Sequence, residues 1–141
     1  MPLNNQTPAH DTLYMGQVQV ICEKITFASL NTITDFLKGK LPPKAHVIPG
    51  SGVHIKTAFN DSGTDTLDVG FRGATTTDDP DAYASLLDLS AVGFIPFDEL
   101  GATTNIMQDA EAILTWRYNG QNSNASAGVA YIIVVYVDNR E

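Results

Sequence analysis

Three aspartates gather around one glycine in residues 59–71, FNDSGTDTLDVGF. Carboxylates so close together could bind Ca²⁺ or act as a general acid and base. The EF-hand pattern fails, because a loop starting at Asn60 has Asp65 where glycine is required, and one starting at Asp61 has Gly63 at a ligand position. A less regular calcium site between strands stays open as an alternative.

The same segment also fits a turn between two strands. Asn and Asp side chains cap their own backbone in turns, and glycine adopts a positive φ without steric cost. Apolar side chains alternate with polar ones on both sides of it, over residues 53–59 and 66–71. We therefore predict a β-hairpin, with Asp61 and Asp65 in the turn and Asp68 facing outward from its strand.

A second acidic cluster, DDPDAY, occupies residues 78–83. Asp78 or Asp79 suits the N-cap of a helix with Pro80 in its first turn, and acidic side chains stabilise that end of the helix dipole. We therefore predict one short helix over residues 81–89, and a metal site here is the alternative.

Histidine and serine show no familiar catalytic or metal-binding pattern. His10, His46 and His54 lack metal-ligand spacing, although the last two flank a proline-glycine bend. Ser51 and Ser126 lie in turn-like stretches without the GxSxG pattern of a nucleophile. Neither GxGxxG nor a Walker loop is present. We expect no catalytic residue, no cofactor and no bound metal.

The single cysteine, Cys22, lies in the apolar run VQVICEKITF and cannot form an internal disulfide. We expect it to be a buried structural thiol. Four aromatic residues, Trp116, Tyr118, Tyr131 and Tyr136, could stack on sugars, although packing in a core or interface is the commoner use of such side chains in strands. A carbohydrate-binding face is therefore an alternative.

Composition narrows the class of partner. The chain has 141 residues, a size usual for one domain, and a net charge of −8. Nucleic-acid binding is not expected, because it depends on clustered Lys and Arg that neutralise phosphates. No signal peptide and no apolar run of membrane-spanning length is visible, so we expect synthesis in a cytoplasm and no membrane contact.

Alternating apolar runs separated by Gly, Pro and Asn dominate the chain, which is typical of an all-β protein. The run at residues 129–139, VAYIIVVYVDN, is apolar on both faces, so it should cross the centre of a sheet or enter an interface. The fold expected is a β-sandwich or a jelly-roll-like barrel with long loops. Strands are predicted over residues 17–30, 53–59, 66–71, 108–120 and 129–139, with a short strand end at 44–48.

The first fifteen residues differ from the rest, because they are rich in Asn, Gln, Thr and Pro. We predict an extended N-terminal arm over residues 1–15 and a single β domain over residues 16–141. The arm is either a disordered terminus or a segment that docks on a neighbour. Its apolar anchors are Leu3, Leu13, Tyr14 and Met15.

Residues 45–138 resemble a set of small virion proteins of tailed bacteriophages, the head decoration (cement) and other minor structural proteins. The resemblance lies in TAFN at residues 57–60, LDVG at 67–70, DAYASLLDLS at 81–90 and GVAYIIVVYV at 128–137. It is a pattern of strand and turn residues without a catalytic signature.

The resemblance implies a non-enzymatic protein on the exterior of a phage capsid, which binds the major capsid protein and forms a homotrimer or homodimer. Its interface candidates are the arm anchors and the strand residues Tyr131, Ile133, Val135 and Val137. A tail, neck or fibre-associated protein is one alternative. A carbohydrate- or receptor-binding module, using Trp116, Tyr118 or the loop at residues 119–128, is the other.

Overall fold

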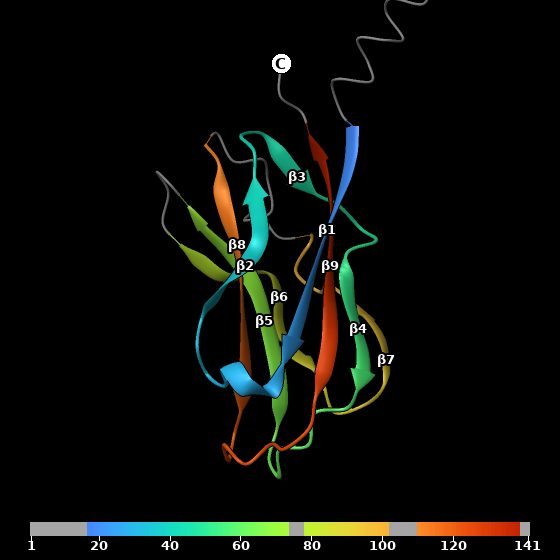
Figure 1. Cartoon of the computed structure of the whole chain (residues 1–141). Helices are drawn as coiled ribbons and strands as arrows, with labels where there is room; N and C mark the ends of the chain where they lie inside the picture. Colours follow the sequence, from blue (N-terminus) through green and yellow to red (C-terminus); the bar gives the residue numbers. More distant parts are fainter. Residues whose placement is uncertain (1–16, 74–77, 102–109, 139–141) are drawn as a thin grey trace, which may run out of the picture.

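Two antiparallel sheets face each other across one apolar core (Figure 1). The computed structural model describes residues 17–73, 78–101 and 110–138. The first sheet has the strand order β1-β9-β4-β7, with β3 also paired to β9, and the second has the order β2-β8-β5-β6. This confirms the predicted all-β, sandwich-like fold. The strands are β1 (Gln17–Thr26), β2 (Thr34–Leu41), β3 (Ala45–Val47), β4 (Gly52–Thr57), β5 (Asp65–Gly73), β6 (Asp79–Asp88), β7 (Gly93–Pro96), β8 (Ala112–Gly120) and β9 (Val129–Asp138).

Strand β9 lies at the centre of the first sheet, as its doubly apolar sequence predicted. It pairs with β1 along one side and with β3 and β4 along the other. Alternate residues face the core, so that Ala130, Ile132 and Val134 are completely buried. The intervening side chains point to the outer face of the sheet and are half-buried.

The predicted hairpin between β4 and β5 is wrong. β4 belongs to the first sheet and β5 to the second, so the chain crosses from one sheet to the other between them. Val53 and Ile55 of β4 face Leu67 and Val69 of β5 across the core, and all four side chains are completely buried. An alternating pattern indicates only that one face of a strand is buried. Two strands that pair within one sheet and two strands in facing sheets both produce this pattern.

The predicted helix at residues 81–89 is also wrong, because this segment lies in the edge strand β6. Three successive residues, Ala82, Tyr83 and Ala84, are buried where the pairing with β5 is irregular. The segment therefore lacks the two-residue alternation by which a strand is recognised in a sequence. Strands β2 and β7 were not predicted, because glycines and prolines in and around these segments suggested loops. The described residues contain no α-helix, only a 3₁₀ turn at Phe27–Ser29 after β1.

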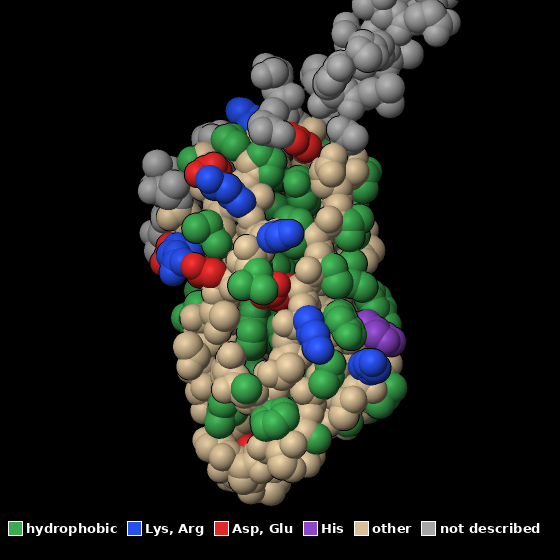
Figure 2. All heavy atoms as spheres, viewed as in Figure 1, with side chains coloured by type: hydrophobic (Ala, Val, Ile, Leu, Met, Phe, Trp, Pro, Cys, Tyr) green, Lys and Arg blue, Asp and Glu red, His purple; other side chains and the backbone are tan. Residues whose placement is uncertain are grey.

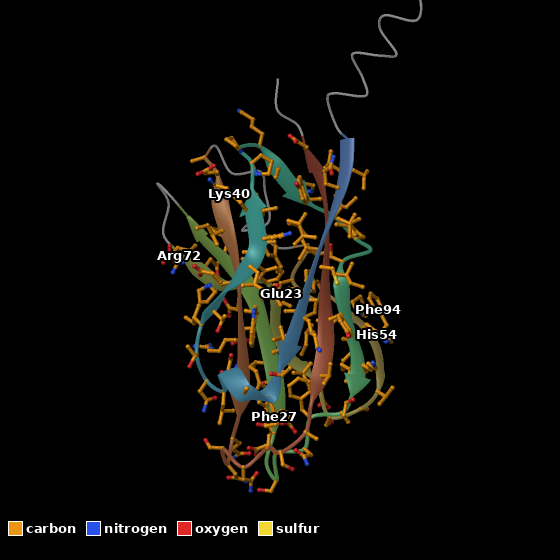
Figure 3. The ribbon with its side chains drawn as sticks, in the orientation of Figure 1. Glu23, Phe27, Lys40, His54, Arg72 and Phe94 are labelled. Carbon is orange, nitrogen blue, oxygen red and sulfur yellow. The ribbon has the colours of Figure 1, made fainter. Side chains whose placement is uncertain are left out.

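A carboxylate joins the two sheets where their edge strands β1 and β2 lie side by side. Glu23 of β1 is only 7% exposed, and Figure 3 shows it between these two strands. Its carboxylate oxygens accept the backbone N–H of Leu37 in β2 at 3.3 and 3.4 Å. This N–H lies where the pairing of β2 with β8 shifts register, so Glu23 supplies an acceptor at an irregular edge.

Gly70 permits the close approach of β6 to β5. A Cβ at this position would lie 2.0 Å from the carbonyl oxygen of Asp79 and 2.4 Å from the carbonyl carbon of Pro80. Both contacts are with backbone, which cannot rotate away as a side chain can. The irregular pairing of β6 therefore requires glycine here.

We predict that Gly70→Ala lowers the free energy of unfolding by about 2–3 kcal/mol or more, because the added methyl overpacks a backbone contact. Urea denaturation followed by tryptophan fluorescence measures the change. Gly101→Ala is the matched control, since a Cβ there has no atom within 4 Å. Equal stability of the two variants would contradict the assignment of Gly70.

Candidate functional site

The carboxylate of Asp61 accepts hydrogen bonds from backbone N–H groups of two loops. It accepts the N–H of Gly63 at 2.8 Å, within its own loop, and the N–H groups of Asn122 and Asn124 at 3.0 Å, from the loop between β8 and β9. Burial raises the pKa of Asp61, but hydrogen bonds from Gly63, Asn122, Asn124 and Ser123 outweigh it, so the pKa lies below its usual value. Asp61 therefore ties the two loops together as an anion.

Asp65 completes this arrangement at the first position of β5. Its Oδ1 accepts the hydroxyl of Tyr118 and the backbone N–H of Asp61. Burial and the hydrogen bond to Asp65 raise the pKa of Tyr118, which therefore stays a neutral donor. The Tyr118 ring packs against Phe59 with ring centroids 4.7 Å apart, and Gly128 leaves room for the Phe59 ring.

These contacts give the acidic loop a structural role. A calcium site needs carboxylate oxygens that converge on one point without competing donors. Here the oxygens of Asp61 and Asp65 accept N–H and O–H groups of the protein instead. Within the described residues, no group of three or more His, Cys, Asp or Glu side chains is arranged to hold a metal.

Asp68 faces away from the core, as its alternation predicted, but it is not exposed. The side chain is covered by β6 and 2% exposed. Its Oδ2 accepts Nη2 of Arg117 at 2.7 Å and Nδ2 of Asn119 at 3.0 Å, and its Oδ1 accepts the backbone N–H of Leu86 at 2.9 Å. The predicted outward direction is therefore right, and the burial, which was not predicted, arises because the irregular edge strand β6 lies against this side chain.

The two candidate serines have structural hydrogen bonds. Ser51 is completely buried, and its Oγ accepts the N–H of Val135 at 2.8 Å and donates to a carbonyl at the junction of β3 and β4. Ser126 shares two hydrogen bonds with Asn60 across the loops.

The two described histidines lie far apart. His46 is paired with Val137 and His54 with Tyr131 of β9. These two partners are six residues apart, which separates the histidines by about 20 Å along the strand. His10 lies outside the described residues.

Two expectations about individual side chains change. Cys22 is exposed rather than buried, because it lies on the outer face of the edge strand β1. Trp116 and Tyr118 are 4% and 0% exposed, so they cannot stack on a sugar. The loop at residues 121–128, which follows them, is fastened to Asp61 and Ser62 through Asn122 and Asn124.

The outer face of the first sheet brings the predicted interface residues of β9 together with apolar side chains from other strands. In one row across the sheet, Cys22 lies beside Ile133, which lies beside Gly52 and then Pro96. The next rows place Val20 beside Val135 and Val18 beside Val137. Val18 and Val20 are 55% and 62% exposed, so this face presents apolar surface to solvent.

Positive groups border the apolar part of this face. One row contains Lys24, Tyr131, His54 and Phe94, and Lys56 follows His54 on the exposed side of β4. Figure 3 shows His54 and Phe94 beside each other at the β4–β7 side, and green side chains continue from there over the first sheet in Figure 2. Among the described residues of β1, β4, β7 and β9, the acidic side chains Glu23 and Asp138 lie on the buried, core-facing side.

This face therefore contains all four of the strand residues singled out from the sequence, Tyr131, Ile133, Val135 and Val137. The arm anchors Leu3, Leu13, Tyr14 and Met15 lie outside the described residues. Four further residues of this face were not predicted from the sequence, although the alternation in QVQVICEK already puts the first two on one side of a strand: Val18, Val20, Phe94 and Lys56. To place these residues on the face, one must know that β1 pairs with β9 and that β7 pairs with β4, and local sequence does not show which strands pair.

The pKa of Asp61 leads to a pH-dependent prediction. Because the folded pKa lies below the unfolded value near 3.8, the stability contributed by this carboxylate is full at neutral pH and is lost as the pH falls through the folded pKa. We predict that Asp61→Asn lowers the melting temperature at pH 7, and that the difference from the native protein shrinks as the pH falls from about 4 towards 2.

Differential scanning calorimetry across this pH range measures the effect. Asp98→Asn is the matched control, because this exposed carboxylate accepts the N–H of Ser85 in β6 and lies in neither of the two loops that Asp61 joins. A difference between Asp61→Asn and the native protein that stays constant down to pH 2 would contradict the role of the ionised carboxylate.

Comparison with known proteins gives a fold relationship. No protein-family profile matches the sequence, and no curated protein is significantly similar to it. A chain in the acidic stable capsid structure of Helicobacter pylori bacteriophage KHP30 has a TM-score of 0.61 and 16% identity, over 87% of this chain and 89% of that one. A chain in the capsid of Ralstonia phage GP4 has a TM-score of 0.62 and 17% identity, over 90% and 88%. The sandwich is thus the fold of chains found in two phage capsids.

Proposed function

We propose that this chain is a capsid decoration (cement) protein of a tailed bacteriophage, which assembles on the outside of the head and stabilises the shell of the major capsid protein. The observation that carries the proposal is the sandwich shared with chains of two phage capsids. The similarity covers 87% and 90% of this chain and 89% and 88% of the two matched chains, so it extends over most of the domain.

The polar groups of the described residues support a structural role. The carboxylates of Asp61, Asp65 and Asp68 and the hydroxyl of Ser51 are all engaged in hydrogen bonds that hold strands or loops in place. A nucleophile or general base needs a group that is free to meet a substrate. The side chains that first suggested chemistry are used instead to stiffen the domain.

The outer face of the first sheet supports assembly. Its apolar rows would bury Val18, Val20 and Ile133 against a neighbour, and apolar burial is the main driving force of association. We assign contact between copies to this face and contact with the shell to the arm, with its anchors Leu3, Leu13, Tyr14 and Met15. Many copies that each bury a modest area would reinforce the shell through avidity.

Co-sedimentation with phage heads that lack the protein tests the proposal. We expect saturable binding at high copy number to mature heads, and weaker binding to unexpanded proheads. A handful of copies per virion, attached at the tail or neck, would replace the head assignment with a tail assignment. Absence of the protein from purified virions would refute a virion role altogether.

The outer face should be required for full binding. We predict that Val20→Glu weakens binding to heads by about tenfold or more, because a buried, unpaired carboxylate disrupts an apolar contact and removes the avidity of assembled copies. Leu37→Glu is the matched control, because Leu37 is 90% exposed on β2, which belongs to the second sheet and adds no residue to the rows of this face. Equal binding of both variants would contradict the assignment of the face.

The arm should act separately from the sheet face. We predict that deletion of residues 1–15 reduces binding to heads, while the oligomeric state of the purified protein and its melting temperature stay unchanged. Sedimentation velocity and co-sedimentation measure the two effects on one preparation. Loss of the oligomer on deletion, with unchanged affinity for heads, would reverse the two assignments.

A further inference from the structure

Two surfaces of the described structure differ in the sign of their charge. The outer face of the first sheet carries Lys24 and Lys56 beside its apolar rows, in a chain whose net charge is −8. Exposed carboxylates gather instead at the edge strand β6 and the loop that follows β7, where Asp81, Asp88 and Asp98 lie. The two regions are therefore complementary in charge.

An exposed leucine projects from the acidic region. Leu86 is 64% exposed, although its neighbours Ala84 and Leu87 are buried. Its φ of 55° is in the left-handed region, which is unfavourable for a bulky residue. The conformation is held by the buried Asp68, whose Oδ1 accepts the Leu86 N–H at 2.9 Å. Leu86 is thus presented outward from a rigid bulge.

Carboxylates of β6 and of the loop after β7 border Leu86. The preceding residue, Ser85, donates its N–H to Asp98 at 3.0 Å and its hydroxyl to Asp81 at 3.5 Å, so both carboxylates lie close to the bulge. Asp88 follows two residues later and is exposed. We call this surface, formed by Asp81, Leu86, Asp88 and Asp98, the acidic ridge. It has one apolar side chain among carboxylates, whereas the sheet face has apolar rows bordered by cations.

We propose that the acidic ridge of one copy docks on the outer face of the first sheet of the next copy. Leu86 would pack against the rows formed by Val20, Ile133 and Val135, and the carboxylates would meet Lys24 and Lys56. This inference rests on the oligomerisation included in the proposed function and names the two surfaces that form the contact.

The two surfaces are different, so the contact is head-to-tail and closes into a ring or continues as a chain of copies. A face-to-face dimer through the first sheet would offer the cations of that face no acidic side chain from the described strands β1, β4, β7 and β9. The ridge supplies both the missing charge and an apolar side chain, and charge complementarity guides such contacts.

Leu86→Asn tests the apolar part of the contact without damage to the fold. Asn adopts a positive φ more readily than Leu, so the melting temperature of the variant, measured at a concentration where the protein is monomeric, should be equal to or above that of the native protein. The dissociation constant between copies, measured by sedimentation equilibrium, should rise about tenfold or more. Leu37→Asn is the control and should leave it unchanged. A dissociation constant unaffected by Leu86→Asn would overturn the proposal.

Cross-linking tests which surfaces meet. Leu86→Cys places a thiol on the ridge, and the native Cys22 is already exposed on the sheet face. A short bismaleimide should link residue 86 of one copy to Cys22 of the next, which gives covalent trimers or longer species. The variant Leu86→Cys with Cys22→Ser should give no 86-to-22 link. Peptide mass spectrometry identifies the linked residues.

The same reaction on protein bound to heads separates this inference from the proposed function. Species linked through residues 86 and 22 on the head support it, even where the free protein is monomeric. Links only between two Cys22 residues, or between residue 86 and the shell protein, overturn the head-to-tail contact while decoration stands. Failure to bind heads, together with a head-to-tail oligomer in solution, refutes decoration and leaves the contact between copies intact.

Discussion

Two carboxylates hold the point at which the chain leaves the first sheet and enters the second. Asp61 gathers the N–H groups of two loops, and Asp65 accepts the Tyr118 hydroxyl from within the core. A buried carboxylate is tolerable only when hydrogen bonds compensate for its lost hydration, and backbone N–H and Tyr118 O–H donors do so here. Because the crossing is fixed, β5 enters the second sheet in one register, and the core side chains of both sheets meet.

The same arrangement leaves the outer face of the first sheet available for contact. The polar groups that could have served a ligand are committed to the loops at one end of the sandwich and to the bulge of β6. What remains over β1, β9 and β4 is apolar surface bordered by positive charge. The residues that stiffen the domain are therefore different from those of the proposed contact face, so a substitution on the face should leave the stability of the fold unchanged.

The sequence predicted the fold class and the position of β9 well, because both depend on local alternation. The predictions from the sequence were wrong where the structure of a segment depends on contacts with distant parts of the chain. The alternation of residues 53–59 and 66–71 could not distinguish a hairpin from two facing sheets, and DDPDAY suits a helix cap as well as an irregular edge strand. Asp68 shows the limit most plainly, since its burial depends on a bulge eighteen residues away. The β9 part of the candidate interface was predictable, whereas Val20 and Phe94 joined it only through strand pairing.

Glu23 has a consequence for the behaviour of the protein at high concentration. The edge strands β1 and β2 present main-chain groups that could add a strand from another molecule, a common start of aggregation. Glu23 points a negative charge inward between these edges and occupies the N–H of Leu37, which a foreign strand would need. Strand addition from another copy at these two edges is therefore disfavoured, even when many copies are crowded together.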